Sequence, residues 1–410
     1  MKTILRLLAF LAALATPAFA ADATADLTAL QALVATKTPA EIAGNSARFR
    51  WNVAHGNAVA AAAEKLMAAY PTDPRRWEAA IILLSRGRIF VKSIDDAKLD
   101  QTRPGTVIKG SVVYDREAQA VWRKHLEELD AQCAAATDMT PATRKEYELG
   151  AIIRHMMTAG MIGAGAHVTP DGSTTKVNPA ESAALLAKLH AELDHVIAAY
   201  PDDPRTTTAF DRFVNLHRRS GASVEAINIM MAAYAEAPSE GIRNIVEVGL
   251  TLQRAQEHPL DWKFTAADGR EVDLAKLRGK VVLIDFWATW CHPCVAEIPN
   301  IVAAYEKYHA QGFEVVGMTL EQAGVPANAT PAVGRAKLEA ARNKMLAFTK
   351  DKGMPWPQYF DGTGWGNPYT KRYGIRGIPR MFLLDQQGKV VTMDARGPKL
   401  EAELRRLLRL

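Results

Sequence analysis

Trp290-Cys291-His292-Pro293-Cys294 closely follows an apolar run, Val281-Val282-Leu283-Ile284-Asp285-Phe286, and opens an amphipathic segment. The run predicts a buried strand, and the segment after it predicts a helix. Two cysteines in the first turn of a helix are close enough to form a disulfide. The N-terminus of a helix offers unpaired N–H groups and a partial positive charge, which stabilise the thiolate that attacks disulfides. The pattern therefore indicates a dithiol site that exchanges electrons with other disulfides.

Cysteine is scarce in this chain, which has only Cys133 besides the pair. An exported protein that used disulfides as structural staples would carry more of them. The paired cysteines are therefore interpreted as chemical. Cys133 lies in a helical pattern, and two interpretations stay open for it: a buried inert thiol, or an intermolecular or resolving thiol.

Residues 1–20 are typical of a signal peptide. Lys2 and Arg6 supply positive charge, Leu7 to Leu14 form a short apolar core, and Ala18-Phe19-Ala20 is a cleavage site before Ala21. We expect a soluble protein exported after cleavage near Ala20, most simply to a bacterial periplasm. Retention of the segment as an uncleaved anchor is the alternative.

The length of 410 residues suggests two or three domains, and 48% hydrophobic residues suffice for packed cores. The net charge of +5 is small for this length, and no Lys/Arg cluster stands apart from acidic neighbours. This charge pattern argues against nucleic acid as a partner.

Residues 21–250 show helical periodicity and are rich in Ala, Leu, Glu and Arg, with no convincing strands. The phrase Ala-Ala-Tyr, followed by a turn with Pro and acidic residues, occurs at Tyr70, Tyr200 and Tyr234. Tyr200 and Tyr234 lie 34 positions apart, which is the repeat length of tetratricopeptide (TPR) hairpins. The sequence therefore predicts an all-α domain of TPR-like helical hairpins.

A polar connector is expected over 251–260, and the pattern changes at Asp261. Strands and helices alternate from there, as in a mixed sheet covered by helices. The expected strands are a hairpin over 264–272, then 281–286, 313–318, 356–360, 381–384 and 389–393, and the expected helices are 291–309, 335–352, 368–373 and 399–408.

Residues 261–410 resemble the thioredoxin fold, specifically the TlpA/ResA-like thiol–disulfide oxidoreductases. The resemblance rests on the motif from Gly279 to Cys294, on Glu297-Ile298-Pro299, and on Tyr373-Gly374-Ile375-Arg376-Gly377-Ile378-Pro379. It implies protein dithiol or disulfide substrates, no cofactor besides the redox-active disulfide, and a membrane electron donor of the DsbD/CcdA type. A helical domain beside such a domain is expected to bind a protein partner.

The resemblance assigns attack to Cys291, the first and more exposed thiol, and resolution to Cys294. A zinc site would need four ligands, and no second Cys or His pair stands near, so no metal is expected. A c-type haem would need His directly after the second cysteine, where Val295 stands.

Two carboxylates complete the expected catalytic set. Asp285 matches the buried carboxylate that serves thioredoxins, through water, as proton acceptor for the second cysteine, and burial raises a carboxyl pKa. Glu297 lies one helical turn after Cys294, which implies a role in pKa tuning or partner recognition. The alternatives are a satisfied strand-end carboxylate at Asp285 and a solvated helix carboxylate at Glu297.

Four residues are expected to border the substrate. Trp290 flanks the site, and His292 either stabilises the Cys291 thiolate or is an exposed spectator. Ile378-Pro379 matches the cis-proline of thioredoxin folds, which exposes backbone groups for an extended substrate. Arg380, which follows, adds positive charge that favours a thiolate or acidic substrates.

The favoured function is thus an exported thiol–disulfide oxidoreductase that acts as a reductase. One alternative is a peroxidase of the peroxiredoxin type, which shares the fold but needs a Pro-containing loop before the attacking cysteine; Ala288-Thr289 supplies none. The other alternative is a TPR-type binding scaffold with a secondary redox domain.

Overall fold

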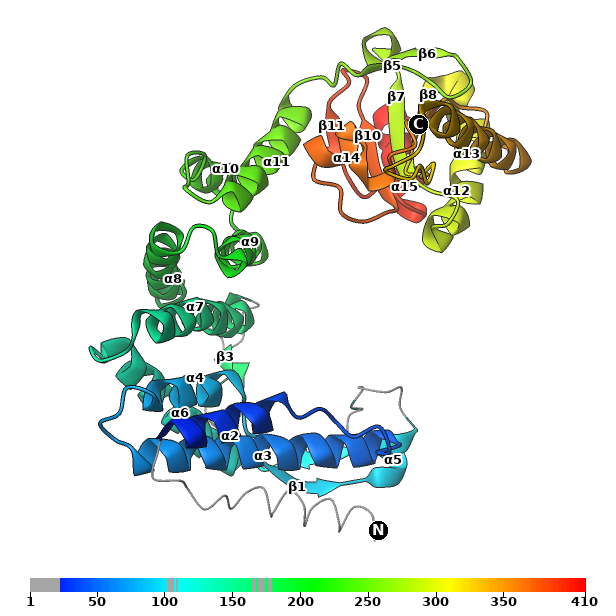
Figure 1. The fold of residues 1–410 in the computed structure, drawn as a ribbon. Helices are drawn as coiled ribbons and strands as arrows, with labels where there is room; N and C mark the ends of the chain where they lie inside the picture. The colour runs from blue at the N-terminus through cyan, green and yellow to red at the C-terminus, as the bar shows by residue number, and fades with distance from the viewer. Residues whose placement is uncertain (1–22, 102–106, 108–109, 164–166, 169–173, 176–178) are drawn as a thin grey trace. The chain divides into compact units, whose positions relative to one another are not determined.

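The computed structural model of the chain describes residues 23–101, 107, 110–163, 167–168, 174–175 and 179–410 (Figure 1). The predicted signal peptide, residues 1–20, lies outside the described residues. The chain divides into two compact units. The N-terminal unit comprises Met1–Ile227 with Ala237–Ile242, and the C-terminal unit comprises Asn228–Glu236 with Arg243–Leu410. Across the described ranges, no helix combines the length and the apolar character needed to cross a membrane.

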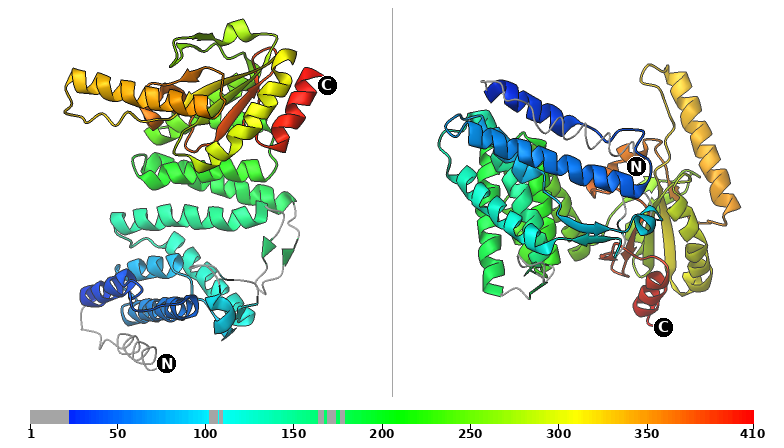
Figure 2. Two further views of the ribbon diagram at one scale, coloured as in Figure 1. Left: turned by 90° about the vertical axis from the view of Figure 1, so that its right-hand side faces the viewer. Right: turned by 90° about the horizontal axis from the view of Figure 1, so that it is seen from below.

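Helices dominate the N-terminal unit, as the sequence predicts (Figures 1 and 2). Their apolar faces enclose a core that includes Leu66, Leu83 and Leu129. The helices are α2 (Ala23–Ala35), α3 (Asn45–Ala69), α4 (Arg76–Ser85), α5 (Asp96–Asp100), α6 (Arg116–Ala135), α7 (Pro141–Gly163), α8 (Pro179–Ala199) and α9 (Pro204–Arg219).

The prediction that this region contains no strands is wrong. Two antiparallel pairs occur, β1 (Val91–Ile94) with β2 (Val112–Tyr114), and β3 (His167–Val168) with β4 (Thr174–Thr175). Each strand has at most four residues, which is too short to produce a readable alternation of apolar and polar residues.

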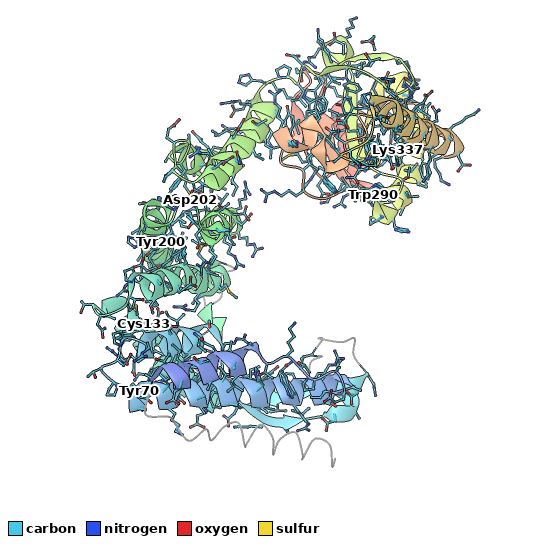
Figure 3. The ribbon with its side chains drawn as sticks, in the orientation of Figure 1. Tyr70, Cys133, Tyr200, Asp202, Trp290 and Lys337 are labelled. Atoms are coloured by element: carbon cyan, nitrogen blue, oxygen red, sulfur yellow. A yellow bond between two sulfur atoms is a disulfide. The ribbon has the colours of Figure 1, made fainter. Side chains whose placement is uncertain are left out.

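The repeated Ala-Ala-Tyr phrase builds the same turn twice, after α3 and after α8. The N–H of Tyr70 bonds to the carbonyl of Leu66, and the N–H of Tyr200 bonds to the carbonyl of Val196, so each tyrosine closes its helix. Each hydroxyl then donates to a carboxylate of an earlier helix: Tyr70 to Asp26 at 2.7 Å, and Tyr200 to Glu148 at 2.8 Å (Figure 3 labels both tyrosines). In both copies, the tyrosine at the end of a helix thus connects that helix to an earlier helix of the unit.

The division between the units falls within α10 (Val224–Ala232) and α11 (Glu240–Glu257). The expected connector over 251–260 is therefore wrong for most of its length, because α11 continues to Glu257. Ala255 is buried in the core of the C-terminal unit and Leu252 packs against it. The polar residues that suggest a connector form the outer face of an amphipathic helix.

A five-stranded mixed sheet forms the centre of the C-terminal unit, in the order β11-β10-β7-β8-β9. β7 pairs in parallel with β8 and antiparallel with β10. A separate hairpin, β5 (Lys263–Thr265) with β6 (Glu271–Asp273), precedes the 3₁₀ turn η1 (Leu274–Leu277). The sheet strands are β7 (Val281–Trp287), β8 (Phe313–Thr319), β9 (Gln358–Tyr359), β10 (Arg380–Leu384) and β11 (Val390–Thr392).

Helices cover the sheet (Figures 1 and 2). They are α12 (His292–Tyr308), α13 (Pro331–Asp351), α14 (Pro368–Arg372) and α15 (Pro398–Leu408), with short 3₁₀ turns η2 (His309–Gln311) and η3 (Gly364–Gly366). α12 lies beside α15, because Lys307 and Tyr308 both bond to Glu401. All seven residues of β7 are buried, since β7 is central in the sheet and covered on both faces. β7 therefore gives the loop that follows it a rigid base.

Candidate redox site

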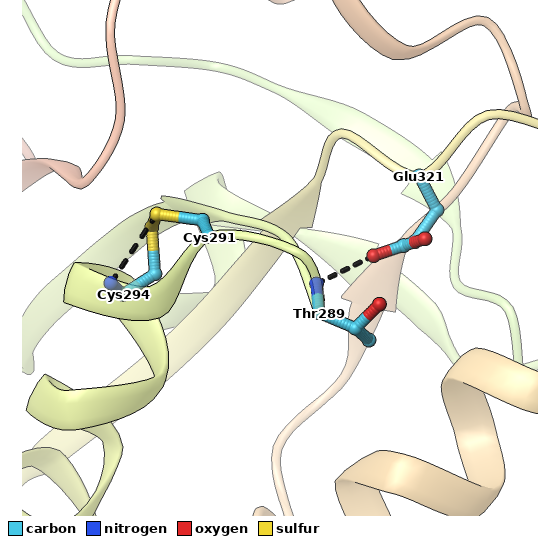
Figure 4. Close-up of a disulfide and its surroundings, with 4 residues drawn as sticks. All are labelled: Thr289, Cys291, Cys294 and Glu321. Atoms are coloured by element: carbon cyan, nitrogen blue, oxygen red, sulfur yellow. Dashed lines mark hydrogen bonds between the residues drawn. A yellow bond between two sulfur atoms is a disulfide. The ribbon is translucent and has the colours of Figure 1, made fainter.

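A disulfide joins Cys291 and Cys294 where the loop after β7 becomes α12 (Figure 4). Their Cα atoms lie 5.2 Å apart. Cys291 caps α12, and its Sγ accepts the backbone N–H of Cys294 at 3.2 Å. In the reduced protein the same N–H, together with the helix dipole, is placed to stabilise a thiolate at Cys291.

Both cysteines are nearly buried, with exposed fractions of 5% for Cys291 and 2% for Cys294. The expectation that Cys291 is the more exposed is met only by this small margin. The distinction between the two sulfurs comes instead from their positions: Cys291 precedes the helix and receives an N–H, whereas Cys294 lies within its first turn.

Asp285 is 2% exposed in the middle of the sheet, opposite Met381 of β10. Burial raises the pKa of Asp285, the negative charge of Glu297 adds a smaller contribution in the same direction, and the two together bring the pKa to about 7. Its Oδ1 has no hydrogen-bond partner among the described residues. A buried carboxyl group with an unpaired oxygen and a pKa near neutrality is suited to taking up and releasing a proton.

Glu297 does not extend freely into solvent. Its Oε1 accepts the backbone N–H of Gly397 at 2.6 Å, and its Oε2 accepts the side-chain amide of Asn300 at 3.2 Å. The first of these bonds ties α12 to the turn before α15. The carboxylate is thereby held where its charge acts on Asp285.

An exposed aromatic pair stands beside the disulfide. Trp290 is 49% exposed and Trp365, from η3, is 40% exposed, with ring centroids 6.4 Å apart. His292 is exposed and forms no hydrogen bond with the described residues, whereas Trp287 is a core residue whose Nε1 donates to Gln358 at 2.9 Å. Sequence reasoning finds Trp290 through the motif and misses Trp365, whose role depends on a contact distant in sequence.

The predicted cis peptide between Ile378 and Pro379 is confirmed, and both residues are half-buried. The next residue, Arg380, opens β10 opposite Phe286 of β7. Because β10 runs antiparallel to β7, the residues before Arg380 lie at the end of the sheet where β7 terminates. The cysteine loop leaves the sheet at that same end.

Glu321 is a site residue that the sequence analysis does not identify. Its Oε1 accepts the backbone N–H of Thr289 at 2.5 Å, within the loop between β7 and Cys291 (Figure 4). The N–H of Leu320 also bonds to the carbonyl of Trp287 at 2.8 Å, so the ends of β7 and β8 are joined twice. The position of Glu321, two residues after the end of β8, which is parallel to β7, is a sequence signal that points to this end of the sheet.

Cys133 is fully buried in α6, and burial raises the pKa of its thiol to about 12. A thiol in this environment forms little thiolate and is unreactive. Among the described residues, no group of three or more His, Cys, Asp or Glu side chains is arranged to hold a metal ion.

Comparison with known proteins finds relatives of the C-terminal region. The Redoxin family matches residues 253–408. The thiol-disulfide oxidoreductase ResA of Bacillus thuringiensis (strain Al Hakam) is 29% identical over 140 residues, which cover 34% of this chain and 68% of that protein. ResA of Bacillus subtilis (strain 168) is 31% identical over 124 residues, which cover 30% and 58% respectively.

A solved structure from Chlorobium tepidum TLS, titled thiol:disulfide interchange protein, thioredoxin family protein, is also similar. It is 24% identical, with a TM-score of 0.28, and the match covers 37% of this chain and 96% of that one. The match to the Redoxin family and the similarity to ResA show that the C-terminal region is a Redoxin domain, and they confirm for it the expected enzyme class, a thioredoxin-like thiol–disulfide oxidoreductase. Its mixed sheet covered by helices is the thioredoxin fold that the sequence predicts.

Proposed function

We propose that this protein is an exported oxidoreductase that reduces disulfides in other proteins through Cys291 and Cys294. The observation that carries the proposal is a disulfide at the N-terminus of α12, packed above a sheet that contains a buried carboxyl group with a pKa of about 7, Asp285. This combination supplies both a nucleophile and a proton acceptor.

The reaction begins when the Cys291 thiolate attacks one sulfur of a substrate disulfide. A mixed disulfide forms, and the other substrate sulfur leaves as a thiolate that takes up a proton. The thiol of Cys294 then loses its proton and attacks Cys291, which releases the second substrate sulfur. Two electrons pass to the substrate, and the protein is left with the Cys291–Cys294 disulfide.

Asp285 is proposed to accept the proton of Cys294, through a bridging water as the resemblance implies. A base works best when its pKa lies near the working pH, and burial places Asp285 there. Glu297 tunes this pKa through its charge and touches neither sulfur in the proposed reaction.

Repeated reduction of substrates requires a supply of electrons. We infer a membrane donor of the DsbD/CcdA type, which reduces the Cys291–Cys294 disulfide after each cycle. Export is supported by the sequence of residues 1–20, with cleavage near Ala20 and a periplasmic location. The helical region 21–250, with TPR-like hairpins, is proposed to dock a protein partner.

The first experiment measures the reduction potential of the Cys291–Cys294 couple against glutathione, followed by tryptophan fluorescence. The chain has eight tryptophans, so a Trp290→Phe variant assigns the signal. A reductase is expected to lie well below about −220 mV. A value near about −120 mV would overturn the reductase proposal and indicate an oxidant.

A second experiment tests the roles of the two sulfurs. The reduced protein is expected to reduce insulin disulfides, a Cys291→Ser variant is expected to be inactive, and a Cys294→Ser variant is expected to accumulate a mixed disulfide. Cys133→Ala is the matched control and should leave the rate unchanged, because that thiol is buried and unreactive. Peroxide turnover without insulin reduction would support the peroxidase instead.

A further inference from the structure

The segment from Trp365 to Arg380 leaves the redox site and returns to it. It begins at Trp365, whose ring lies 6.4 Å from that of Trp290, and it ends at Arg380, which pairs with Phe286 near the end of β7. Between these points Tyr373 is buried in the core, where its hydroxyl accepts the Nε1 hydrogen of Trp262 at 3.1 Å. Both ends of the segment therefore lie near the chain from Phe286 to Trp290, which leads into Cys291.

This segment has a one-sided charge. Residues 362–384 contain no Asp or Glu, and they carry four cations that are all exposed: Lys371, Arg372, Arg376 and Arg380. The statement that no Lys/Arg cluster stands apart from acidic neighbours is wrong for this segment. Arg376 and Arg380, which stand on either side of Ile378 and Pro379, form no ion pair or hydrogen bond with side chains of the described residues.

None of the carboxylates that the structure describes near the site is ion-paired with Arg376 or Arg380, because each is buried or is bonded to another group. Asp285 is buried, Glu297 accepts the N–H of Gly397, and Glu321 accepts the N–H of Thr289. Further out, Asp361 accepts bonds from Thr363 and Tyr359, while Asp394 is paired with Arg396 and Lys399. The exposed charged side chains of the segment itself are therefore all cationic.

We propose that the preferred substrates are disulfides in acidic polypeptide segments, held by Arg376 and Arg380 with the rings of Trp290 and Trp365. This inference rests on the proposed function and names its substrate class. Unpaired exposed cations attract an acidic segment and speed its encounter with the site, while the two rings offer apolar area to whichever side chains flank its cysteines. These four residues are called the docking surface below.

The test uses three synthetic peptides of equal length, each with one internal disulfide, whose flanking residues are Glu, Gln or Lys. Reduced full-length protein is mixed with each peptide, and its oxidation is followed by fluorescence. Every rate is divided by the rate of the same peptide with dithiothreitol, which removes intrinsic differences in disulfide reactivity. At low ionic strength the Glu peptide is expected to react about tenfold faster than the Lys peptide, and salt should narrow the ratio.

Two double variants with the same change of net charge locate the effect. Arg376→Gln with Arg380→Gln should reduce the ratio to about two or less. Lys276→Gln with Lys389→Gln should keep it. These control residues lie near the opposite end of the sheet, where β7 begins and where the N–H of Gly279 bonds to the carbonyl of Gln386. Equal reduction potentials in both variants would exclude an indirect effect on the cysteine couple.

The aromatic part of the docking surface is tested separately with Trp365→Leu. This variant should react more slowly with all three peptides by a similar factor, so the ratio of the Glu-peptide rate to the Lys-peptide rate should stay unchanged. A ratio near one in the unaltered protein, or an equal loss in both double variants, would overturn the inference while the reduction of insulin still supports the proposed function. Failure to reduce insulin and all three peptides would instead refute the proposed function itself.

Discussion

The carboxylate of Glu297, in α12, raises the pKa of Asp285, which lies buried in β7. Glu297 is itself held by the N–H of Gly397, so the distance between the two acids is fixed by the packing of α12 against the turn before α15. The protein thus sets the strength of a buried base with a charge on the neighbouring helix.

Glu297→Gln is predicted to lower the pKa of Asp285, because a nearby negative charge disfavours the ionised form. The acid limb of the pH profile for insulin reduction should then move to lower pH. The shift should be less than about one unit, since burial is the larger cause. Glu306→Gln, an exposed residue of the same helix, is the control and should leave the profile in place.

Asp285→Asn is predicted to stabilise the folded protein while slowing the resolving step. The folded pKa of about 7 lies above the ordinary aspartate pKa of 3.8, so the contribution of Asp285 to stability is full below about pH 4 and is lost as pH rises through 7. Removal of the charge should raise the free energy of unfolding at pH 8 by roughly 2–4 kcal/mol and change it little at pH 4. Urea unfolding at both pH values measures this difference, and a loss of stability at pH 8 would contradict it.

His155 links three helices of the N-terminal unit. Its Nε2 lies 2.8 Å from Asp130 of α6, its Nδ1 lies 2.7 Å from Glu192 of α8, and these hydrogen bonds raise its pKa to about 9. The charged ring therefore stabilises the fold fully below about pH 6.5, and this stabilisation is lost as pH rises through 9.

His155→Gln is predicted to lower the free energy of unfolding by about 1–3 kcal/mol at pH 6, and by less at pH 10. Chemical denaturation followed by circular dichroism measures both values. His258→Gln, an exposed histidine after α11, is the control. An equal loss at the two pH values would show that packing and not charge accounts for the effect.

Glu321→Ala is predicted to loosen the loop between β7 and Cys291, because the N–H of Thr289 loses its acceptor. Hydrogen exchange at Thr289 should become faster, and insulin reduction should slow by about two- to tenfold. Glu321→Gln keeps an acceptor oxygen, so it should retain most of the protection of the Thr289 amide from exchange and most of the rate of insulin reduction. If the amide of Thr289 exchanges no faster in the Ala variant, Glu321 does not position the loop.

The C-terminal unit is predicted closely by its sequence because its signals are local. β7 is a continuous apolar run, α14 begins at Pro368 as expected, and the motif around Pro379 identifies the cis peptide. Trp365 and Glu321 are missed for the opposite reason. Each acts through a contact with a residue tens of positions away, which no periodicity or spacing records.

In the N-terminal unit, the recurring tyrosines correctly mark where helices end. The spacing between Tyr200 and Tyr234 suggests a regular repeat, yet the turn after Tyr200 matches most fully the turn after Tyr70. Both of these have Asp three positions later, bonded to the N–H and the guanidinium of the following Arg. Tyr234 lacks that Asp, so the sequence phrase alone overstates the likeness of its third copy.

Helix α11 determines at which residue the chain can be truncated to produce the C-terminal unit alone. Ala255 and Leu252 fill the core of the C-terminal unit, and Val248 lies so close to Gly374 that a methyl group on Gly374 would be 2.4 Å from it. A shortened protein that begins at Asp261 would expose this apolar surface to water and tend to aggregate. One that begins ahead of Arg243 keeps the helix, and is the better starting point for producing the redox half by itself.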